Sequence, residues 1–138
     1  CGYTPFDGAE YDYYTTTKGV LEKVKAHVGD VDFAVQPELV SLLSSRNFGR
    51  YADEKGEMKV CFISNNDITG GNSGSAMFNS KGELLGLAFD GNWEAMSSDI
   101  LYEPKMQRTI GVDVRYILFM IEKYGKAGNL IKELNIIN

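Results

Sequence analysis

The segment Thr69 to Ala76 holds the residues of this sequence that are best suited to chemistry. It reads Thr-Gly-Gly-Asn-Ser-Gly-Ser-Ala, so that Ser73 stands among glycines and other small residues. Small neighbours leave room for a substrate acyl group beside the hydroxyl, and an adjacent base can turn a serine into a nucleophile. The alternative interpretation is an ordinary turn, because Gly, Ser and Asn are common turn residues.

The core of this segment, Gly71 to Ser75, resembles the nucleophile loop of chymotrypsin-like peptidases, usually written G-[DN]-S-G-[GS]-P. In that resemblance Ser73 is the nucleophile, and the backbone N–H groups of Gly71 and Ser73 form the oxyanion hole. Glycine at position 71 lets the backbone turn sharply without a Cβ atom in the way. Ala76 departs from the proline of the pattern, a position that shapes the following strand rather than the chemistry.

A catalytic triad also needs a histidine beside the serine and a carboxylate that orients it. His27 is the only histidine. It lies at the end of a predicted helix, and we interpret it as a surface histidine. Chymotrypsin-like chains place the histidine and then the aspartate well before the serine, on the first barrel. We therefore expect both groups on a preceding half that is absent from this chain, and no turnover by the chain alone.

The composition is typical of a globular domain, with 138 residues, 43% apolar and 24% charged. A net charge of −5 and scattered basic residues argue against nucleic acid as a partner. No apolar stretch approaches the roughly 20 residues that span a bilayer. The first residues do not form a signal peptide, so that any export signal is expected outside this sequence.

The two cysteines, Cys1 and Cys61, leave their pairing open, because sequence alone does not show it. Cys61 lies in the apolar run 60–63, which favours a buried free thiol. The chain has no Cys/His cluster with the spacing of metal ligands. We therefore expect neither a structural metal nor a cofactor.

The patterns predict a helical first third, a β-rich middle and a helical end. Strands are expected from alternating or β-branched residues, and helices from apolar spacing with Pro37 in a first turn. The expected strands are 11–17, 58–63, 75–78, 84–89 and 109–112, the expected helices 19–28, 37–43, 113–124 and 130–134. Residues 49–56 are expected as a loop and 79–82 as a hairpin turn.

Longer motifs then resemble one family, the bacterial serine dipeptidyl-peptidases of the 7 and 11 type. The motifs are 11–16, 49–52, 65–75, 86–94, 107–110 and 112–116. The resemblance implies a chymotrypsin-like double β-barrel, interrupted by a helical domain, in a chain several times longer. This chain would be its C-terminal portion: residues 1–57 as a helical and loop lead-in, 58–112 as the barrel part with the nucleophile loop, and 113–138 as C-terminal helices.

The resemblance assigns two further positions. Asp90 matches the acidic residue that binds the free α-amino group of the substrate, and Gly91 matches the position that shapes the primary specificity pocket. With glycine at this position, the sequence resembles the dipeptidyl-peptidase 7 type, which prefers an apolar residue before the scissile bond. Without the resemblance, Asp-Gly is an ordinary turn dipeptide. Phe89 and Trp93 are either cleft or core residues, and Asp67 either supports the loop or is solvated.

The resemblance thus implies a serine exopeptidase that releases dipeptides from peptides with a free N-terminus. It also implies that the N-terminal half of the same parent chain is a partner, that the full-length form is a homodimer, and that it works in the periplasm or at the cell surface. Two alternatives stay open: a non-catalytic peptidase-like binding module and a trypsin-like endopeptidase. Asp90 argues against the endopeptidase.

Overall fold

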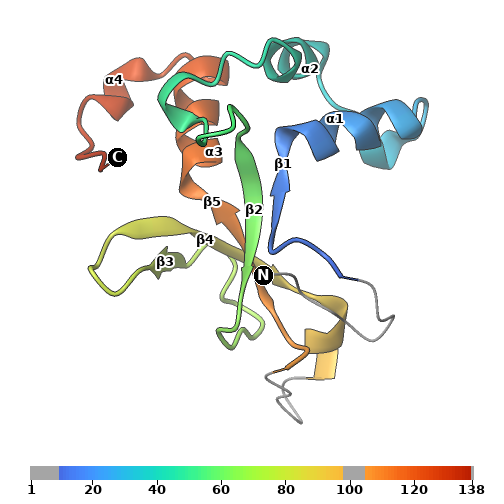
Figure 1. Ribbon diagram of the computed structural model, residues 1–138, viewed down its shortest axis with the longest axis vertical. Coiled ribbons are helices and arrows are strands. Elements are labelled where there is room, and N and C mark those ends of the chain that lie inside the picture. Colours follow the sequence, from blue (N-terminus) through green and yellow to red (C-terminus); the bar gives the residue numbers. More distant parts are fainter. Residues whose placement is uncertain (1–9, 98–104, 138) are drawn as a thin grey trace. The chain divides into compact units, whose positions relative to one another are not determined.

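The chain forms two compact units, seen in a computed structural model that describes residues 10–97 and 105–137 (Figure 1). One unit comprises Cys1–Thr15 and Val60–Val114, and the other comprises Thr16–Lys59 and Arg115–Asn138. The first unit holds most of a five-stranded sheet, and the second holds most of the helices.

The sheet has the strand order β1-β2-β5-β4-β3. Its strands are β1 (Tyr14–Thr16), β2 (Lys59–Ser64), β3 (Ala76–Phe78), β4 (Leu84–Gly91) and β5 (Thr109–Asp113). The pairs β2–β5, β5–β4 and β4–β3 are antiparallel. The predicted strands 58–63, 75–78, 84–89 and 109–112 are confirmed within two residues at each end. Of the expected strand 11–17, only residues 14–16 form β1, because α1 begins at Thr17.

Two glycines let side chains pack closely over the centre of the sheet. In the ladder Gly86 on β4 lies opposite Met77, and Gly111 on β5 lies opposite Phe62. A Cβ atom at Gly111 would come within 2.7 Å of both the Met77 sulfur and the Phe62 ring. Met77 is accordingly buried in the first unit, together with Ala88.

The second unit is built from short helices. These are α1 (Thr17–Ala26), the 3₁₀ helix Val31–Phe33, α2 (Pro37–Ser44), the 3₁₀ helix Gly49–Tyr51, most of α3 (Val114–Phe119), a π-helical turn (Met120–Tyr124) and α4 (Gly128–Ile131). Leu43, Phe48, Tyr51 and Phe119 are almost fully buried. The Phe119 ring meets Phe48 and Tyr51 edge-on, at centroid distances of 5.7 and 6.1 Å, a favoured geometry for aromatic pairs.

Several sequence predictions need correction here. The expected helix 113–124 is regular only to Phe119, because the Gly125 N–H donates to Met120 O, five residues back, and closes a π-type turn. The helix is expected to begin at Asp113, but Asp113 is the last residue of β5 and is buried. The expected loop 49–56 begins with a 3₁₀ turn. The predicted helix at Pro37 is confirmed, with the proline in the first turn.

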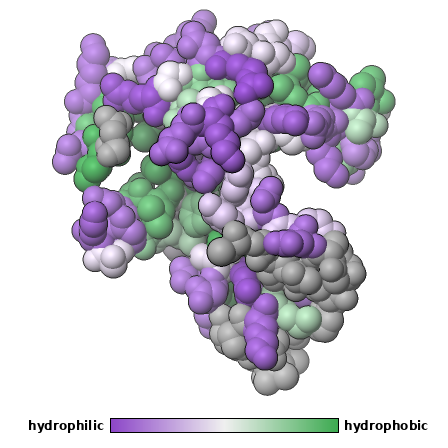
Figure 2. Space-filling model, in the orientation of Figure 1, coloured by the Kyte–Doolittle hydropathy of each residue, from purple (hydrophilic) through white to green (hydrophobic). Residues whose placement is uncertain are grey.

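The β3–β4 hairpin exposes apolar side chains. In Figure 2 apolar surface covers this hairpin beside its hydrophilic turn. The side chains of Phe78, Leu84 and Leu85 are 60%, 41% and 42% exposed. In the part of the chain that the structure describes, no helix has the length and apolar character of a membrane span.

Candidate active site

The loop before β3 is closed by a reciprocal set of hydrogen bonds between Thr69 and Asn72. The Asn72 Oδ1 atom accepts from the Thr69 N–H at 2.9 Å and from the Thr69 hydroxyl at 3.2 Å. The Asn72 N–H in turn donates to Thr69 O at 3.2 Å. Gly71, inside this closed turn, has φ +96°, and Gly74 has φ +86°. Both values fall where side chains are strongly disfavoured, which explains the glycines of the motif.

The backbone N–H groups of residues 71–75 divide into two sets. Those of Asn72, Gly74 and Ser75 donate to Thr69 O, Ala88 O and Asn72 O. Within residues 10–97 and 105–137, no acceptor lies in hydrogen-bond range of the N–H groups of Gly71 and Ser73. Two uncommitted donors on either side of Asn72 are therefore available to an external acceptor.

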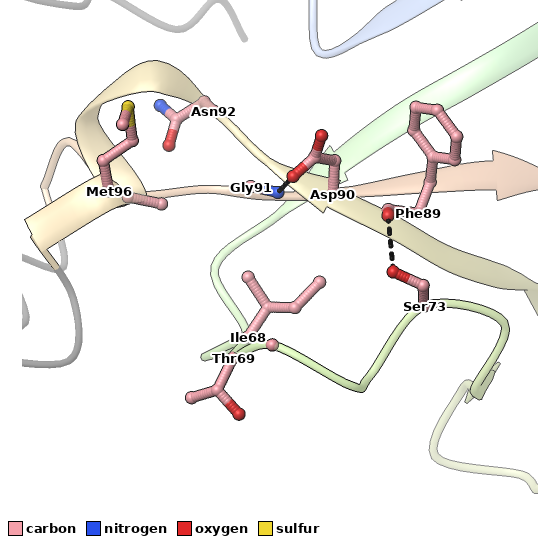
Figure 3. Close-up of a pocket in the computed structure, with 10 residues that line it drawn as sticks. Ile68, Thr69, Ser73, Phe89, Asp90, Gly91, Asn92 and Met96 are labelled. Carbon is pink, nitrogen blue, oxygen red and sulfur yellow. Dashed lines mark hydrogen bonds between the residues drawn. The ribbon is translucent and has the colours of Figure 1, made fainter.

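Ser73 lies against the end of β4. Its hydroxyl donates to Phe89 O at 3.2 Å, a contact drawn in Figure 3. The β4–β5 register shifts between Ala88 and Asp90, so that Phe89 is an extra residue in its strand. Bulges of this kind re-aim side chains and are frequent beside active sites. The Gly74 N–H to Ala88 O bond, at 2.7 Å, holds the loop at this bulge.

A pocket of about 220 Å³ opens between the loop and the end of β4 (Figure 3). It lies within the first unit and is lined by Ile68, Thr69, Gly70, Ser73, Phe89, Asp90, Gly91, Asn92, Ala95 and Met96. The structure thus brings together three of the four site residues expected from the sequence, Ser73, Asp90 and Gly91. Gly71 lies in the same loop but does not line the pocket.

Asp90 carries an exposed carboxylate at this pocket. Its Oδ1 atom accepts from the N–H of Gly91 at 2.8 Å, which fixes the orientation of the group. Among the described residues, no cationic side chain pairs with it. An oriented, unpaired carboxylate on a pocket wall can accept a charge-assisted hydrogen bond from a bound cation.

Hydrogen bonds of Asn92 hold the part of the pocket that follows β4. Its N–H donates to Arg108 O at 2.9 Å, and its Oδ1 atom accepts from the Arg108 N–H at 2.8 Å. Its Nδ2 atom donates to Met106 O and to the Glu94 carboxylate, both at 2.8 Å. Asn92 O accepts from the Ala95 N–H at 2.9 Å and so begins the 3₁₀ helix η3 (Trp93–Ser97).

The remaining sequence candidates lie in varied surroundings. Phe89 lines the pocket, whereas Trp93 is 82% exposed and belongs neither to the core nor to the pocket lining. Asp67 is exposed. Cys61 is half-buried rather than fully buried, and burial raises the pKa of its thiol. Cys1 lies outside the described residues, and so does any pairing that involves it.

His27 belongs to the second unit, at the C-terminal end of α1. Its Nδ1 atom lies 2.9 Å from Lys23 O, so that this ring nitrogen carries the proton and donates. The imidazole stacks on Phe33 at a centroid distance of 4.0 Å. These contacts give His27 a local structural role.

Sequence reasoning missed Ile68, Ala95 and Met96 as pocket residues. No local signal marks them, because an aliphatic or small residue at a loop position has many uses. The described part of the chain contains no cluster of three potential metal-binding side chains.

Comparisons with known proteins identify the family to which the chain belongs. Residues 1–136 match the family model of Peptidase S46. The chain is 60% identical to dipeptidyl-peptidase 7 of Porphyromonas endodontalis over 136 residues, which are 99% of this chain and 16% of that protein. It is 45% identical to the Asp/Glu-specific dipeptidyl-peptidase of Porphyromonas gingivalis, over 99% of this chain and 19% of that protein.

A solved structure has the same fold. The crystal structure of Porphyromonas endodontalis DPP11 in complex with the dipeptide Arg-Glu matches 96% of this chain with a TM-score of 0.89 and 43% identity. The match covers 19% of that chain. The predicted fold class, a mostly antiparallel sheet with helices of the chymotrypsin-like type, is thereby confirmed. The chain spans less than a fifth of the length of these relatives, and it belongs to the Peptidase S46 family.

Proposed function

We propose that this segment carries the nucleophile and the amine-binding site of a serine dipeptidyl-peptidase whose chain extends beyond it. The observation that carries the proposal is the meeting of Ser73, Asp90 and Gly91 at one pocket. The relatives that share the sequence over almost its whole length are dipeptidyl-peptidases several times longer.

In this proposal the Ser73 hydroxyl attacks the carbonyl carbon of the second residue of a peptide. An acyl-enzyme forms, the remainder of the peptide leaves, and water then releases the dipeptide. The N–H groups of Gly71 and Ser73 stabilise the oxyanion, which fits their lack of an acceptor among the described residues. A donor of this kind typically changes kcat by about 10²–10³.

Asp90 binds the free α-amino group of the substrate. The distance between this carboxylate and the reacting serine fixes how many residues fit between the N-terminus and the scissile bond, and two residues are released. Gly91 adds no side chain and no charge to its part of the pocket, which favours an apolar residue before the scissile bond, as in the dipeptidyl-peptidase 7 type.

The rest of the parent chain supplies the missing parts. Among the described residues the Ser73 hydroxyl donates to a backbone carbonyl, and the only histidine is engaged elsewhere. We infer that the base and its carboxylate come from the N-terminal half and that the isolated segment has no turnover. We also infer that the remainder of the parent chain covers the exposed apolar side chains of the β3–β4 hairpin. The longer relatives have enough further chain to do so. We also propose a homodimer in the periplasm or at the cell surface.

The deciding experiment uses the full-length protein that contains this segment. Release of a reporter from a dipeptide with an apolar second residue is compared with release from its N-acetylated twin. We expect strong cleavage of the free form alone, and none by Ser73→Ala. A fluorophosphonate probe should label the unmutated protein and fail to label the variant.

The other outcomes separate the alternatives. Equal cleavage of both reporters would support an endopeptidase and discard the amine site. No cleavage and no labelling would support a non-catalytic binding module. Turnover by Ser73→Ala at the unmutated rate would discard Ser73 as the nucleophile.

A further inference from the structure

Gly91 and Ala95 approach each other closely across the turn that ends β4. A Cβ atom built on Gly91 would lie 2.9 Å from the Ala95 Cβ, closer than two such carbons approach in folded proteins. The same atom would lie 3.6 Å from Ile68 Cγ2, which is ordinary van der Waals contact. The φ angle of Gly91 lies outside the left-handed region, so the obstacle to a side chain there is Ala95 and not the backbone conformation.

The Ala95 methyl group cannot move aside easily. A methyl carbon is fixed by its own backbone, since rotation about χ1 moves only its hydrogens. That backbone is held by the Ala95 N–H to Asn92 O bond, at 2.9 Å. Asn92 is itself bound to Arg108 through two hydrogen bonds of 2.8 and 2.9 Å. A side chain at position 91 therefore requires either a shift of η3 or a smaller residue at position 95.

We propose that Ala95 is a specificity-determining residue of this pocket, acting together with Gly91. Its methyl group limits the depth available to the apolar side chain that precedes the scissile bond, and it excludes any side chain at position 91. The inference rests on the proposed function and adds the coupled partner of Gly91. In Figure 3 Ile68 extends from the loop towards Gly91 and so forms the opposite wall.

A larger residue at position 95 should fill the pocket. The measured quantity is the Phe/Ala reporter ratio, that is, kcat/KM for a reporter with Phe at the second position divided by kcat/KM for a reporter with Ala there. In the full-length protein we expect Ala95→Leu to lower this ratio by about tenfold or more, because a few methylenes in an apolar pocket have an effect of this size. Trp93→Ala is the matched control, because Trp93 lies on the same helix, is 82% exposed and does not line the pocket. The control should leave the ratio unchanged.

The steric coupling is tested by a double-mutant cycle of Gly91→Ala, Ala95→Gly and the two combined. Gly91→Ala should lower both the melting temperature and the Phe/Ala reporter ratio, and Ala95→Gly in that background should restore both. Labelling by a fluorophosphonate counts the folded sites, so that each rate is expressed per competent enzyme. The cycle isolates the pair, since each single change removes or adds one methyl group.

The possible failures are distinguishable. If the changes in melting temperature caused by Gly91→Ala and Ala95→Gly simply add in the double variant, the steric coupling would be overturned. Coupled melting temperatures with an unchanged reporter ratio for every variant, Ala95→Leu included, would overturn the specificity role. An unmutated protein that cleaves no reporter would overturn the proposed function, and the specificity role with it.

Discussion

At the scale of single residues, Asn72 explains how the loop around Ser73 keeps its shape. Its side-chain oxygen accepts two hydrogen bonds from Thr69, and its N–H returns one. The turn so formed holds Gly71 and Ser73 with their N–H groups free of acceptors among the described residues. In the proposed mechanism Asn72 is therefore a positioning residue, because it acts through the orientation of its neighbours.

We predict that Asn72→Ala in the full-length protein lowers kcat by about ten- to a hundredfold and changes KM little, since oxyanion donors act mainly in the transition state. Asn72→Asp keeps the accepting oxygen and should restore most of the rate. Steady-state kinetics on the free dipeptide reporter measure both. Equal losses for the two variants would contradict the positioning role.

Asp90 gives a second prediction at this scale. Asp90→Asn keeps the shape and removes the charge, so we expect kcat/KM for the free dipeptide reporter to fall about ten- to a hundredfold, the worth of a charge-assisted hydrogen bond. Cleavage of the N-acetylated reporter should stay as low as before. Unchanged preference for the free form would contradict the assignment of the amine site.

At the scale of elements, the contact between β4 and β5 depends on two glycines with unequal tolerance. A Cβ atom at Gly86 would overlap the Val112 carbonyl oxygen, a backbone atom, whereas a Cβ atom at Gly111 would meet the flexible ends of Met77 and Phe62. Backbone atoms of a central ladder move less easily than side-chain ends. The two positions form a natural comparison.

We therefore predict that Gly86→Ala destabilises the full-length protein by about 3 kcal/mol or more, at the upper edge of the range for overpacked cores. For Gly111→Ala we expect about 1–2 kcal/mol, which lies within that range. Chemical denaturation with a spectroscopic readout gives both values. The reverse order would contradict the register assigned to β4 and β5.

The second unit contains a partly buried pair of ionisable side chains, Tyr51 and Glu122, whose pKa values are shifted. Tyr51 is 2% exposed, and its hydroxyl donates to the Glu122 carboxylate at 2.6 Å. Burial, aided by this hydrogen bond, raises the pKa of Tyr51 to about 12, while the same bond lowers the pKa of Glu122. Because folding raises the tyrosine pKa, its contribution to stability is complete below about pH 10 and is lost as pH rises through about 12.

We predict that Tyr51→Phe lowers the stability of the full-length protein by about 1–2 kcal/mol at neutral pH, because a partly buried hydrogen bond to a charged group is lost. The difference between the two proteins should shrink as pH rises from 10 to 12. Urea denaturation at a series of pH values measures it. A difference that stays constant up to pH 12 would contradict the pairing.

At the scale of the whole molecule, the apolar side of the β3–β4 hairpin is where we propose that the remainder of the parent chain packs. Phe78 and Leu84 are 60% and 41% exposed in this segment. If the remainder of the parent chain covers them, Phe78→Ser should destabilise the full-length protein by about 2–3 kcal/mol, as for a buried aromatic that is made polar. Lys81→Ala, in the exposed turn of the same hairpin, is the control. It should change the free energy of unfolding by no more than about 0.5 kcal/mol. An effect of Phe78→Ser as small as that of the control would mean that this side is open in the parent.

The sequence by itself determined the local features of this protein. The loop that we propose to carry the nucleophile is recognisable because Gly71 and Gly74 are needed for positive φ angles, a requirement that acts within a few residues. The hairpin at 79–82 and the helix that begins at Pro37 follow from similarly local signals. The family is evident from the length of the shared motifs.

Only the tertiary structure decided which distant residues meet at the pocket. The register of β4 against β5, with its shift at Phe89, places a backbone carbonyl beside the Ser73 hydroxyl. The bonds of Asn92 to Arg108 bring Ala95 against Gly91. Such contacts depend on strand register and on the packing of segments far apart in sequence, and neither leaves a periodic or compositional mark on the residues involved.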